Sequence, residues 1–209
     1  VSGAIPHMPY RVSVSYTNEN GILKTSNMER LTGAISLNPN FFDKKLNIQL
    51  NVKGIYNTNR FADTGAIGMA TQYDPTQPIY MDGNPYGNGY FMYMKSGNNP
   101  TPVDIGLANP VSILDSKHDE STVYRSIGNA QIDYKFHFLP ELRANLNLGY
   151  DVSKSEGDVI IEDNAPMTWC QGNYKTGFGE NSSYYQLKRN TLLDFYLNYA
   201  KEFGAHHVD

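Results

Sequence analysis

Six segments of the chain alternate apolar and polar side chains with a period of two, and this alternation constrains the fold more than any other feature. The segments lie near residues 10–18, 28–38, 46–59, 122–138, 142–153 and 185–200. Successive side chains of a β-strand point to opposite faces, so each segment should form a strand with one apolar and one polar face. The third is the clearest, with Leu46 and Ile48 set against Asn47 and Gln49. The sequence therefore predicts an all-β, antiparallel fold.

Short and long connections alternate strictly between these segments. Short turns are expected at residues 39–45, 138–141 and 201–206, a hairpin at 18–27, and long loops at 60–121 and 154–184. Loops of the last two lengths are uncommon in compact soluble domains. Short turns at one end of an up-and-down meander and long loops at the other are typical of outer-membrane barrels. We therefore predict an incomplete segment of a large transmembrane β-barrel with long extracellular loops.

Aromatic residues bracket the predicted strands. Those near the short turns are Phe41, Phe42, Phe136, Phe138, Tyr199 and Phe203, and those near the long loops are Tyr16, Tyr56, Tyr150, Tyr184 and Tyr185. Two such bands fit two membrane interfaces, where an amphipathic ring is half wet. Tyrosine and phenylalanine are also common in soluble strands. The alternative is therefore a soluble β-sandwich that binds carbohydrate or protein, in which the apolar faces would turn inward against a second sheet.

Composition and motifs exclude several classes of function. The net charge is −4 without a basic block, so nucleic acid is not an expected partner. No catalytic motif occurs, so we expect no enzyme activity and no cofactor. No metal site is expected either, since the Asp82–Asn84 loop lacks the bidentate glutamate of an EF-hand and His206-His207 has no further ligands nearby. Cys170 alone cannot form an intramolecular disulfide.

Several stretches in a fixed order resemble the SusC/RagA-type TonB-dependent outer-membrane transporters of Bacteroidetes. They are Pro9–Ser13, Tyr16–Ser26, Asn59–Asp63, Asp74–Tyr80, Ile127–His137 and Leu142–Gly149. The resemblance implies a barrel of roughly 22 strands with an N-terminal plug. It also implies import of glycans or peptides, a SusD-like surface lipoprotein as a lid, and energy supplied by TonB. Residues 1–209 would be a partial barrel domain, with the plug and the remaining strands absent, because six strands cannot close a membrane barrel.

Two groups of side chains are candidates for function. Residues of the long loops could stack on sugar rings, or could instead pack the loops internally; they are Tyr80, Tyr86, Tyr90, Phe91, Tyr93 and Trp169. The polar positions of three strands should face the lumen, against the plug or the path of the solute; they are Lys53, Asp133, Lys135, Arg143, Asn145 and Asn147. The apolar positions of the same strands should face outer-membrane lipid.

Overall fold

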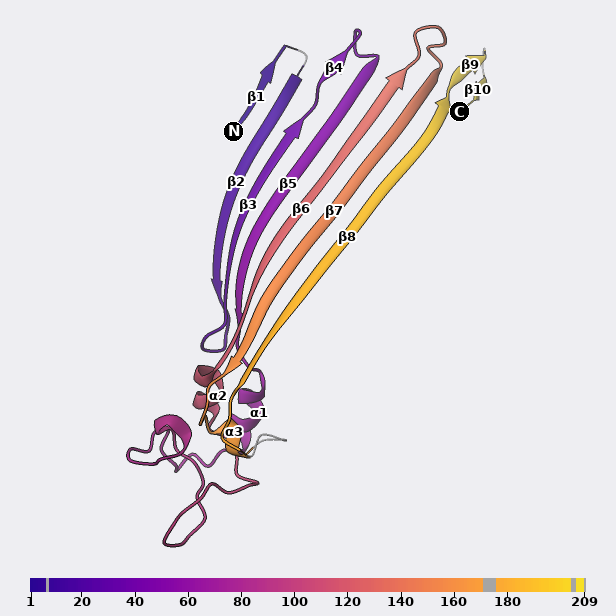
Figure 1. Cartoon of the computed structure of the whole chain (residues 1–209). Coiled ribbons are helices and arrows are strands. Elements are labelled where there is room, and N and C mark those ends of the chain that lie inside the picture. Colours follow the sequence, from indigo (N-terminus) through magenta and orange to yellow (C-terminus); the bar gives the residue numbers. More distant parts are fainter. Residues whose placement is uncertain (7, 171–175, 204–205, 209) are drawn as a thin grey trace.

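The protein forms one long antiparallel sheet with a group of loops and short helices at one end (Figure 1). The computed structural model describes residues 1–6, 8–170, 176–203 and 206–208. Within them, the long strands are β2 (Met8–Asn20), β3 (Asn27–Leu37), β5 (Leu46–Phe61), β6 (Lys117–Lys135), β7 (Leu142–Ile161) and β8 (Glu180–Tyr199). Each pairs with its neighbour in the chain. The predicted antiparallel meander is therefore confirmed.

Four short strands accompany the long ones in the described residues. β1 (Ser2–Ile5) pairs with the edge of β2, and β4 (Asn40–Phe41) pairs with β5 inside the first short turn. β9 (Lys201–Phe203) and β10 (His206–Val208) pair with each other. The side chains from residue 203 onward are not described, so the interface position expected for Phe203 and the exclusion of a metal site at His206-His207 lie outside the described residues.

The long strands depart from their predicted ranges at both ends. β7 continues to Ile161 and β8 begins at Glu180, so the second long connection shrinks from 154–184 to 162–179. The first shrinks from 60–121 to 62–116, and β6 ends before the predicted 138. Most of the added residues are polar, as in Lys117–Ser121 and Lys154–Asp158, so these stretches show no alternation of apolar and polar side chains. Backbone pairing continues there regardless, since ladder hydrogen bonds do not depend on side-chain polarity.

The long connections also contain helices that the sequence did not predict. They are α1 (Gly65–Gln72), η1 (Gly87–Gly89), α2 (Pro110–Ser116) and α3 (Met167–Cys170). All are too short to show helical periodicity. α2 begins at a recognisable signal, because the Asn109 side chain accepts hydrogen bonds from the amides of Val111 and Ser112. No helix in the described part of the chain is long and apolar enough to span a membrane.

The register places most apolar side chains of the six long strands on one face, with Ile55, Ile127 and Leu192 among the exceptions on the other face. Ile48, Ile132, Leu146 and Phe195 form one row across the sheet, and Leu50, Ala130, Leu148 and Leu193 form another. The sequence prediction that Leu46, Ile48, Leu50, Leu146, Leu148 and Phe195 share a face is confirmed. No second sheet packs on this face among the described residues. The soluble sandwich is therefore not the observed architecture.

A band of tyrosines ends the apolar face on the side of the long loops. Tyr16, Tyr56 and Tyr124 lie in one register row, and the Tyr56 and Tyr124 ring centroids are 5.2 Å apart. Tyr124 was not among the residues that the sequence analysis placed in this band. Tyr150 lies nearer the middle of the sheet, opposite Gly128, and Tyr184 lies on the polar face opposite Gly157, so both were placed wrongly in this band. Simple counting along a strand does not reveal the register between strands.

The apolar face has the height of a membrane core. From Leu46 to Tyr56, β5 rises about 34 Å along its own axis. At the tilt of about 45° typical of barrel strands, this length spans about 24 Å. Beyond the tyrosine band, the same face carries Glu29, Thr58 and Thr122. The face therefore changes from apolar to polar where a strand about 10 residues long would leave the bilayer.

Candidate functional site

The face opposite the apolar one is lined mainly by amides, hydroxyls and charged side chains. Lys53, Asp133, Lys135, Arg143, Asn145 and Asn147 all belong to it. Asp133 pairs in register with Asn145, and an Arg143 Nη2 donates to Asp133 Oδ1 at 2.7 Å. Lys53 stands apart, one strand away and nearer the long loops. The strands thus bring together all the predicted lumen candidates except Lys53.

An amide row crosses the middle of this polar face. Gln49, Gln131 and Asn147 are register neighbours on β5, β6 and β7. Asn145 is only 8% exposed, because its neighbours on the sheet cover it. The Asn147 Oδ1 is buried without a hydrogen-bond partner in the described residues. A buried acceptor left unpaired costs about 1–3 kcal/mol. The row therefore places three amide side chains next to one another on the polar face.

A second ion pair on the polar face was not singled out from the sequence. Arg125 donates to both carboxylate oxygens of Asp151, from Nε at 2.9 Å and from Nη2 at 2.6 Å. This two-pronged geometry holds a guanidinium and a carboxylate in one plane. The two residues are register-adjacent on β6 and β7, within two positions of direct opposition. Both residues have the polar parity of their strands, but only the register between β6 and β7 shows that they meet.

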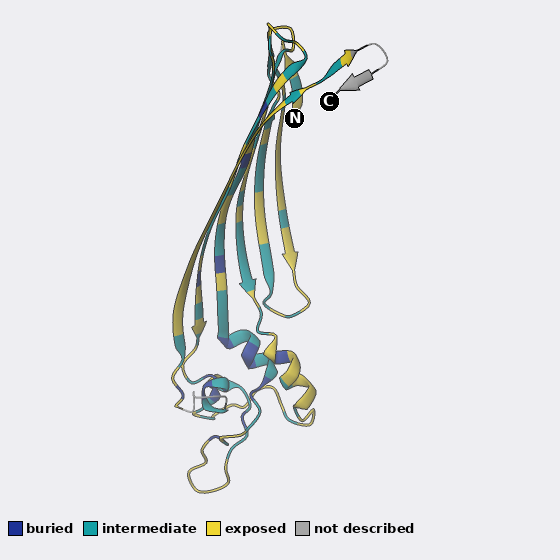
Figure 2. Ribbon diagram, turned by 90° about the vertical axis from the view of Figure 1, so that its right-hand side faces the viewer, coloured by how far each residue is buried: buried dark blue, intermediate teal, exposed yellow. Residues whose placement is uncertain are grey.

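The long connections form a compact unit at the end of the sheet, which we call the loop cap (described residues of 62–116 and 162–179). Its centre is Ile113, Ala66 and Ala108, with Met69, Leu114 and Met167 packed around them. Figure 2 shows buried positions concentrated on the helices there, whereas the strands are mainly intermediate or exposed. Asn109 is also buried and donates from Nδ2 to the Ile79 carbonyl at 2.7 Å. The loop cap is therefore a folded unit with a core of its own.

Polar contacts fix the loop cap to the strands. At its base, Lys117 Nζ lies 2.9 Å from Asp63 Oδ2. Burial opposes ionisation of Asp63, but the hydrogen bonds from Lys117 and the Gly65 amide outweigh it and hold the pKa of Asp63 below its ordinary value. On the far side, Lys24 in the β2–β3 turn lies 2.8 Å from Asp115 of α2. These contacts join segments distant in the sequence.

Most of the aromatic candidates pack against one another inside the loop cap. Tyr86 and Trp169 meet edge to face at 5.0 Å, and Trp169 Nε1 donates to Asn164 Oδ1 at 2.9 Å. Phe91 and Tyr93 are likewise in edge contact at 5.3 Å. These four rings are half-buried. Internal packing, the alternative weighed from the sequence, therefore accounts for their positions.

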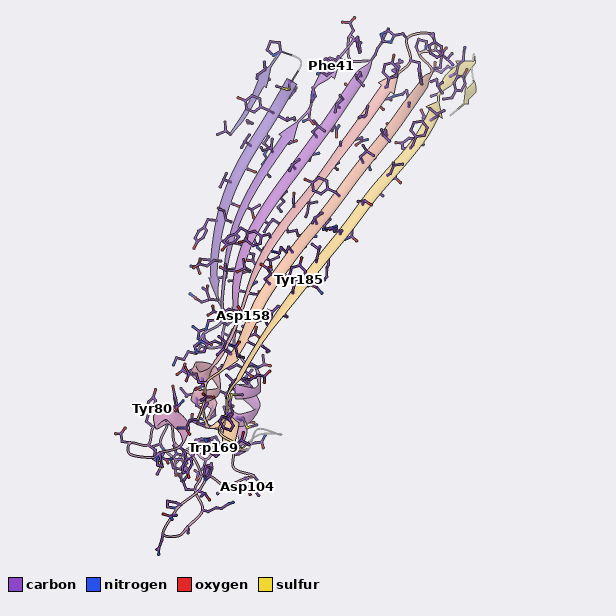
Figure 3. The ribbon with its side chains drawn as sticks, in the orientation of Figure 1. Phe41, Tyr80, Asp104, Asp158, Trp169 and Tyr185 are labelled. Atoms are coloured by element: carbon purple, nitrogen blue, oxygen red, sulfur yellow. The ribbon has the colours of Figure 1, made fainter. Side chains whose placement is uncertain are left out.

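Tyr80 differs from the other candidates because it is 59% exposed. Its ring lies 5.3 Å from that of Tyr90, and their backbones form an isolated bridge. Tyr90 in turn donates to Asp115 Oδ2 at 3.0 Å, and burial is the main cause that raises the pKa of Tyr90 to about 12. Tyr80 and Trp169 both lie in the cap, far from Phe41 at the short-turn end (Figure 3). Tyr80 is thus the aromatic candidate best placed to meet a solute.

The described residues contain no group of three or more histidine, cysteine, aspartate or glutamate side chains able to hold a metal ion. Cys170 is packed against the cap core, and burial raises the pKa of its thiol to about 11. A thiol with such a pKa is almost entirely protonated at neutral pH and is a poor nucleophile. The described residues therefore offer neither a metal-binding cluster nor a reactive thiol.

A single open sheet with one apolar face, one polar face and a loop cap beyond a tyrosine band is the wall of a transmembrane β-barrel. Comparison with known proteins agrees. The chain is 36% identical over its whole length to the TonB-dependent receptor SusC of Bacteroides thetaiotaomicron. It is 26% identical over 99% of its length to the TonB-dependent receptor P3 of Formosa agariphila, and 27% identical over 74% to the receptor P26 of the same organism. No family model matches.

The chain belongs to the SusC-type TonB-dependent receptors, which are proteins of the outer membrane. It spans 21% of the length of SusC and 20% of that of P3. The resemblance predicted from the sequence is therefore confirmed.

Proposed function

We propose that this segment forms part of the barrel wall of an outer-membrane transporter that imports glycans or peptides. The observation that carries the proposal is the division of one sheet into two chemically different faces. The apolar face, with Leu193 69% and Phe195 61% exposed, suits lipid. The polar face suits a water-filled or plugged lumen. An importer needs both, because the wall must be stable in the bilayer while a polar solute passes inside.

The chemistry of the polar face supports a neutral, hydroxyl- or amide-rich solute. Two arginines of this face are neutralised by carboxylates, in the pairs Arg143–Asp133 and Arg125–Asp151. Between them lies the row of Gln49, Gln131 and Asn147, whose amides both donate and accept hydrogen bonds. Sugars and peptide backbones present the same two kinds of group. These two ion pairs leave little net charge beside the amide row, so a neutral solute is not repelled there.

The loop cap supplies the outer end of this path in the proposal. It would lie outside the cell, because long loops of outer-membrane barrels are extracellular. Tyr80 would stack on an incoming ring or peptide group, while the other aromatic residues keep the cap rigid. A SusD-like surface lipoprotein would close over the cap, and TonB would provide energy to the whole receptor. The names of the relatives support TonB dependence.

Uptake assays on the complete receptor test the proposal. Cells that carry or lack the receptor are offered labelled oligosaccharides and labelled oligopeptides of similar size. We expect one class to enter only when the receptor is present, and entry to stop when the proton gradient is collapsed. A receptor present in normal amount at the surface that imports neither class would contradict the proposed solutes.

A further inference from the structure

Two basic side chains stand on the otherwise apolar face, at the level of the tyrosine band. Lys154 of β7 lies in the register row of Tyr124 and Tyr56. Arg189 of β8 lies opposite Val152, one diagonal step from Lys154. Diagonal neighbours across an antiparallel pair are about 7 Å apart. The two cations therefore form one local patch that faces away from the polar lumen side.

The patch lies at a depth in the bilayer where a charged side chain that faces lipid is tolerated. On the same face, the next positions toward the short turns are Tyr150 and Leu148 on β7, and Thr191 and Leu193 on β8. None of them is charged. An arginine or lysine near the midplane of a barrel costs about 2–4 kcal/mol, but close to the interface it costs about 0–1 kcal/mol. The patch thus lies where polar headgroups meet acyl chains.

The donors of the patch are only partly used. Lys154 Nζ lies 2.6 Å from Glu156 Oε1 and 5.7 Å from the centre of the Tyr185 ring. These contacts hold the Lys154 side chain in place and leave some of its three hydrogen-bond donors available to a ligand. Arg189 forms no ion pair or hydrogen bond with the described residues. Its guanidinium is a planar fork of five donors that matches a phosphate.

A groove of about 570 Å³ opens beside the patch on the side of the loop cap. Rings and acceptors line it, among them Tyr124, Tyr185, Thr122, Glu156 and Asp158. Tyr185 and Asp158 both lie where β7 and β8 approach the cap (Figure 3). Aromatic faces with hydroxyls and carboxylates are the groups that bind sugars. From the middle of the sheet outward, the surface therefore offers an apolar track, then two cations, then a sugar-compatible groove.

We propose that this surface binds a phosphorylated glycolipid of the outer leaflet. Its phosphate would bridge Lys154 and Arg189, its acyl chains would lie along Leu148 and Leu193, and its sugar would enter the groove at Tyr185. The order of the three chemistries along the strands matches the order of the three parts of such a lipid. This lipid site depends on the lipid-facing assignment of the sheet and is independent of which solute the receptor transports.

The test uses the complete receptor, purified in a neutral detergent and examined by native mass spectrometry. Three probes are compared: a bisphosphorylated glucosamine glycolipid, the same lipid with its phosphates removed, and inorganic phosphate. We expect the phosphorylated lipid to bind, the dephosphorylated lipid to bind about 30-fold more weakly, and inorganic phosphate not to displace the lipid. Equal binding of both lipids, or displacement by millimolar inorganic phosphate, would overturn the proposal.

Variants locate the site. The double variant K154Q/R189Q should bind the phosphorylated lipid about 30-fold more weakly. The matched control is K188Q, which removes a charge from the adjacent residue on the opposite face and should bind normally. A double variant that binds as well as the unmodified receptor, or a K188Q variant that is equally impaired, would refute the site. If the double variant fails to assemble, the comparison of the two lipids on the unmodified receptor still decides.

Discussion

The sheet and the loop cap use apolar side chains in opposite ways. The buried hydrophobic residues of the described chain are Ala66, Met92, Ala108, Ile113 and Ala165, and all lie in the cap. In the sheet, by contrast, Val14 is 74% and Leu193 is 69% exposed. The cap is organised for water and turns its apolar groups inward. The sheet is organised for lipid and turns them outward. The same residue types therefore report which solvent each region meets.

The largest expected effect comes from emptying the cap core. Ile113→Ala should destabilise the cap by about 2–5 kcal/mol, because a fully buried side chain is lost and the small core has few neighbours to refill the space. Amide hydrogen exchange of the complete receptor measures this. Protection should fall across α1 and α2 while the strands stay protected. The control Leu193→Ala, on the exposed face, should leave cap protection unchanged.

An arginine placed on one or the other face of β7 should show which face meets lipid and which meets water. Leu148→Arg should destabilise the assembled barrel by about 2–4 kcal/mol, since Leu148 lies near the middle of the apolar face. Asn147→Arg, at the adjacent residue on the polar face, should cost much less. Urea unfolding of the receptor in lipid vesicles measures both. Equal costs at the two positions would contradict the assignment of faces.

The attachment of the cap to the sheet should depend on pH. Because the pKa of Asp63 is lowered below its ordinary value of 3.8, the Asp63–Lys117 contact stabilises the cap base above that value. The stabilisation should be lost as the pH falls below about 4. Protease cleavage within 62–116 of the complete receptor measures it. Asp63→Asn should be cleaved faster at pH 7 and should show no further increase at lower pH from this contact.

The smallest expected effect on stability is at Tyr80. Tyr80→Ala should leave the cap folded, because the ring is mostly exposed, and should weaken solute uptake if it stacks on the solute. Trp169→Ala should instead loosen the cap, since the Trp169 ring packs on Tyr86. Uptake and surface amount are measured for both. Normal uptake by the Tyr80→Ala receptor would exclude Tyr80 as a contact.

The sequence predicts the sheet better than the cap for a physical reason. Strand alternation is local, so five residues are enough to predict that Leu46, Ile48 and Leu50 share one face. The cap core instead joins Ala66 to Ala108 and Ile113, more than forty positions along the chain. Its helices are shorter than the window in which helical periodicity becomes visible. The cap core is therefore defined by contacts between residues that are distant in the sequence.

The candidate sites show the same division. Alternation alone places Asp133, Arg143 and Asn145 together on the polar face. It cannot show that Arg125 meets Asp151, because that contact depends on the register between β6 and β7. Nor can composition distinguish a ring that meets a solute from one that packs a loop. Tyr80 and Tyr86 look alike in the sequence, and only their exposure separates them.

The most direct test of the lipid-facing and lumen-facing assignment is a cysteine scan of residues 145–150 on β7. Each position is changed to cysteine in the complete receptor, with Cys170→Ser and with any cysteine outside this segment replaced. Positions 146, 148 and 150 should be labelled by a lipid-soluble maleimide and shielded from a membrane-impermeant one, and positions 145, 147 and 149 should show the reverse. A labelling pattern without this period of two would contradict the account of β7 as part of a membrane barrel wall.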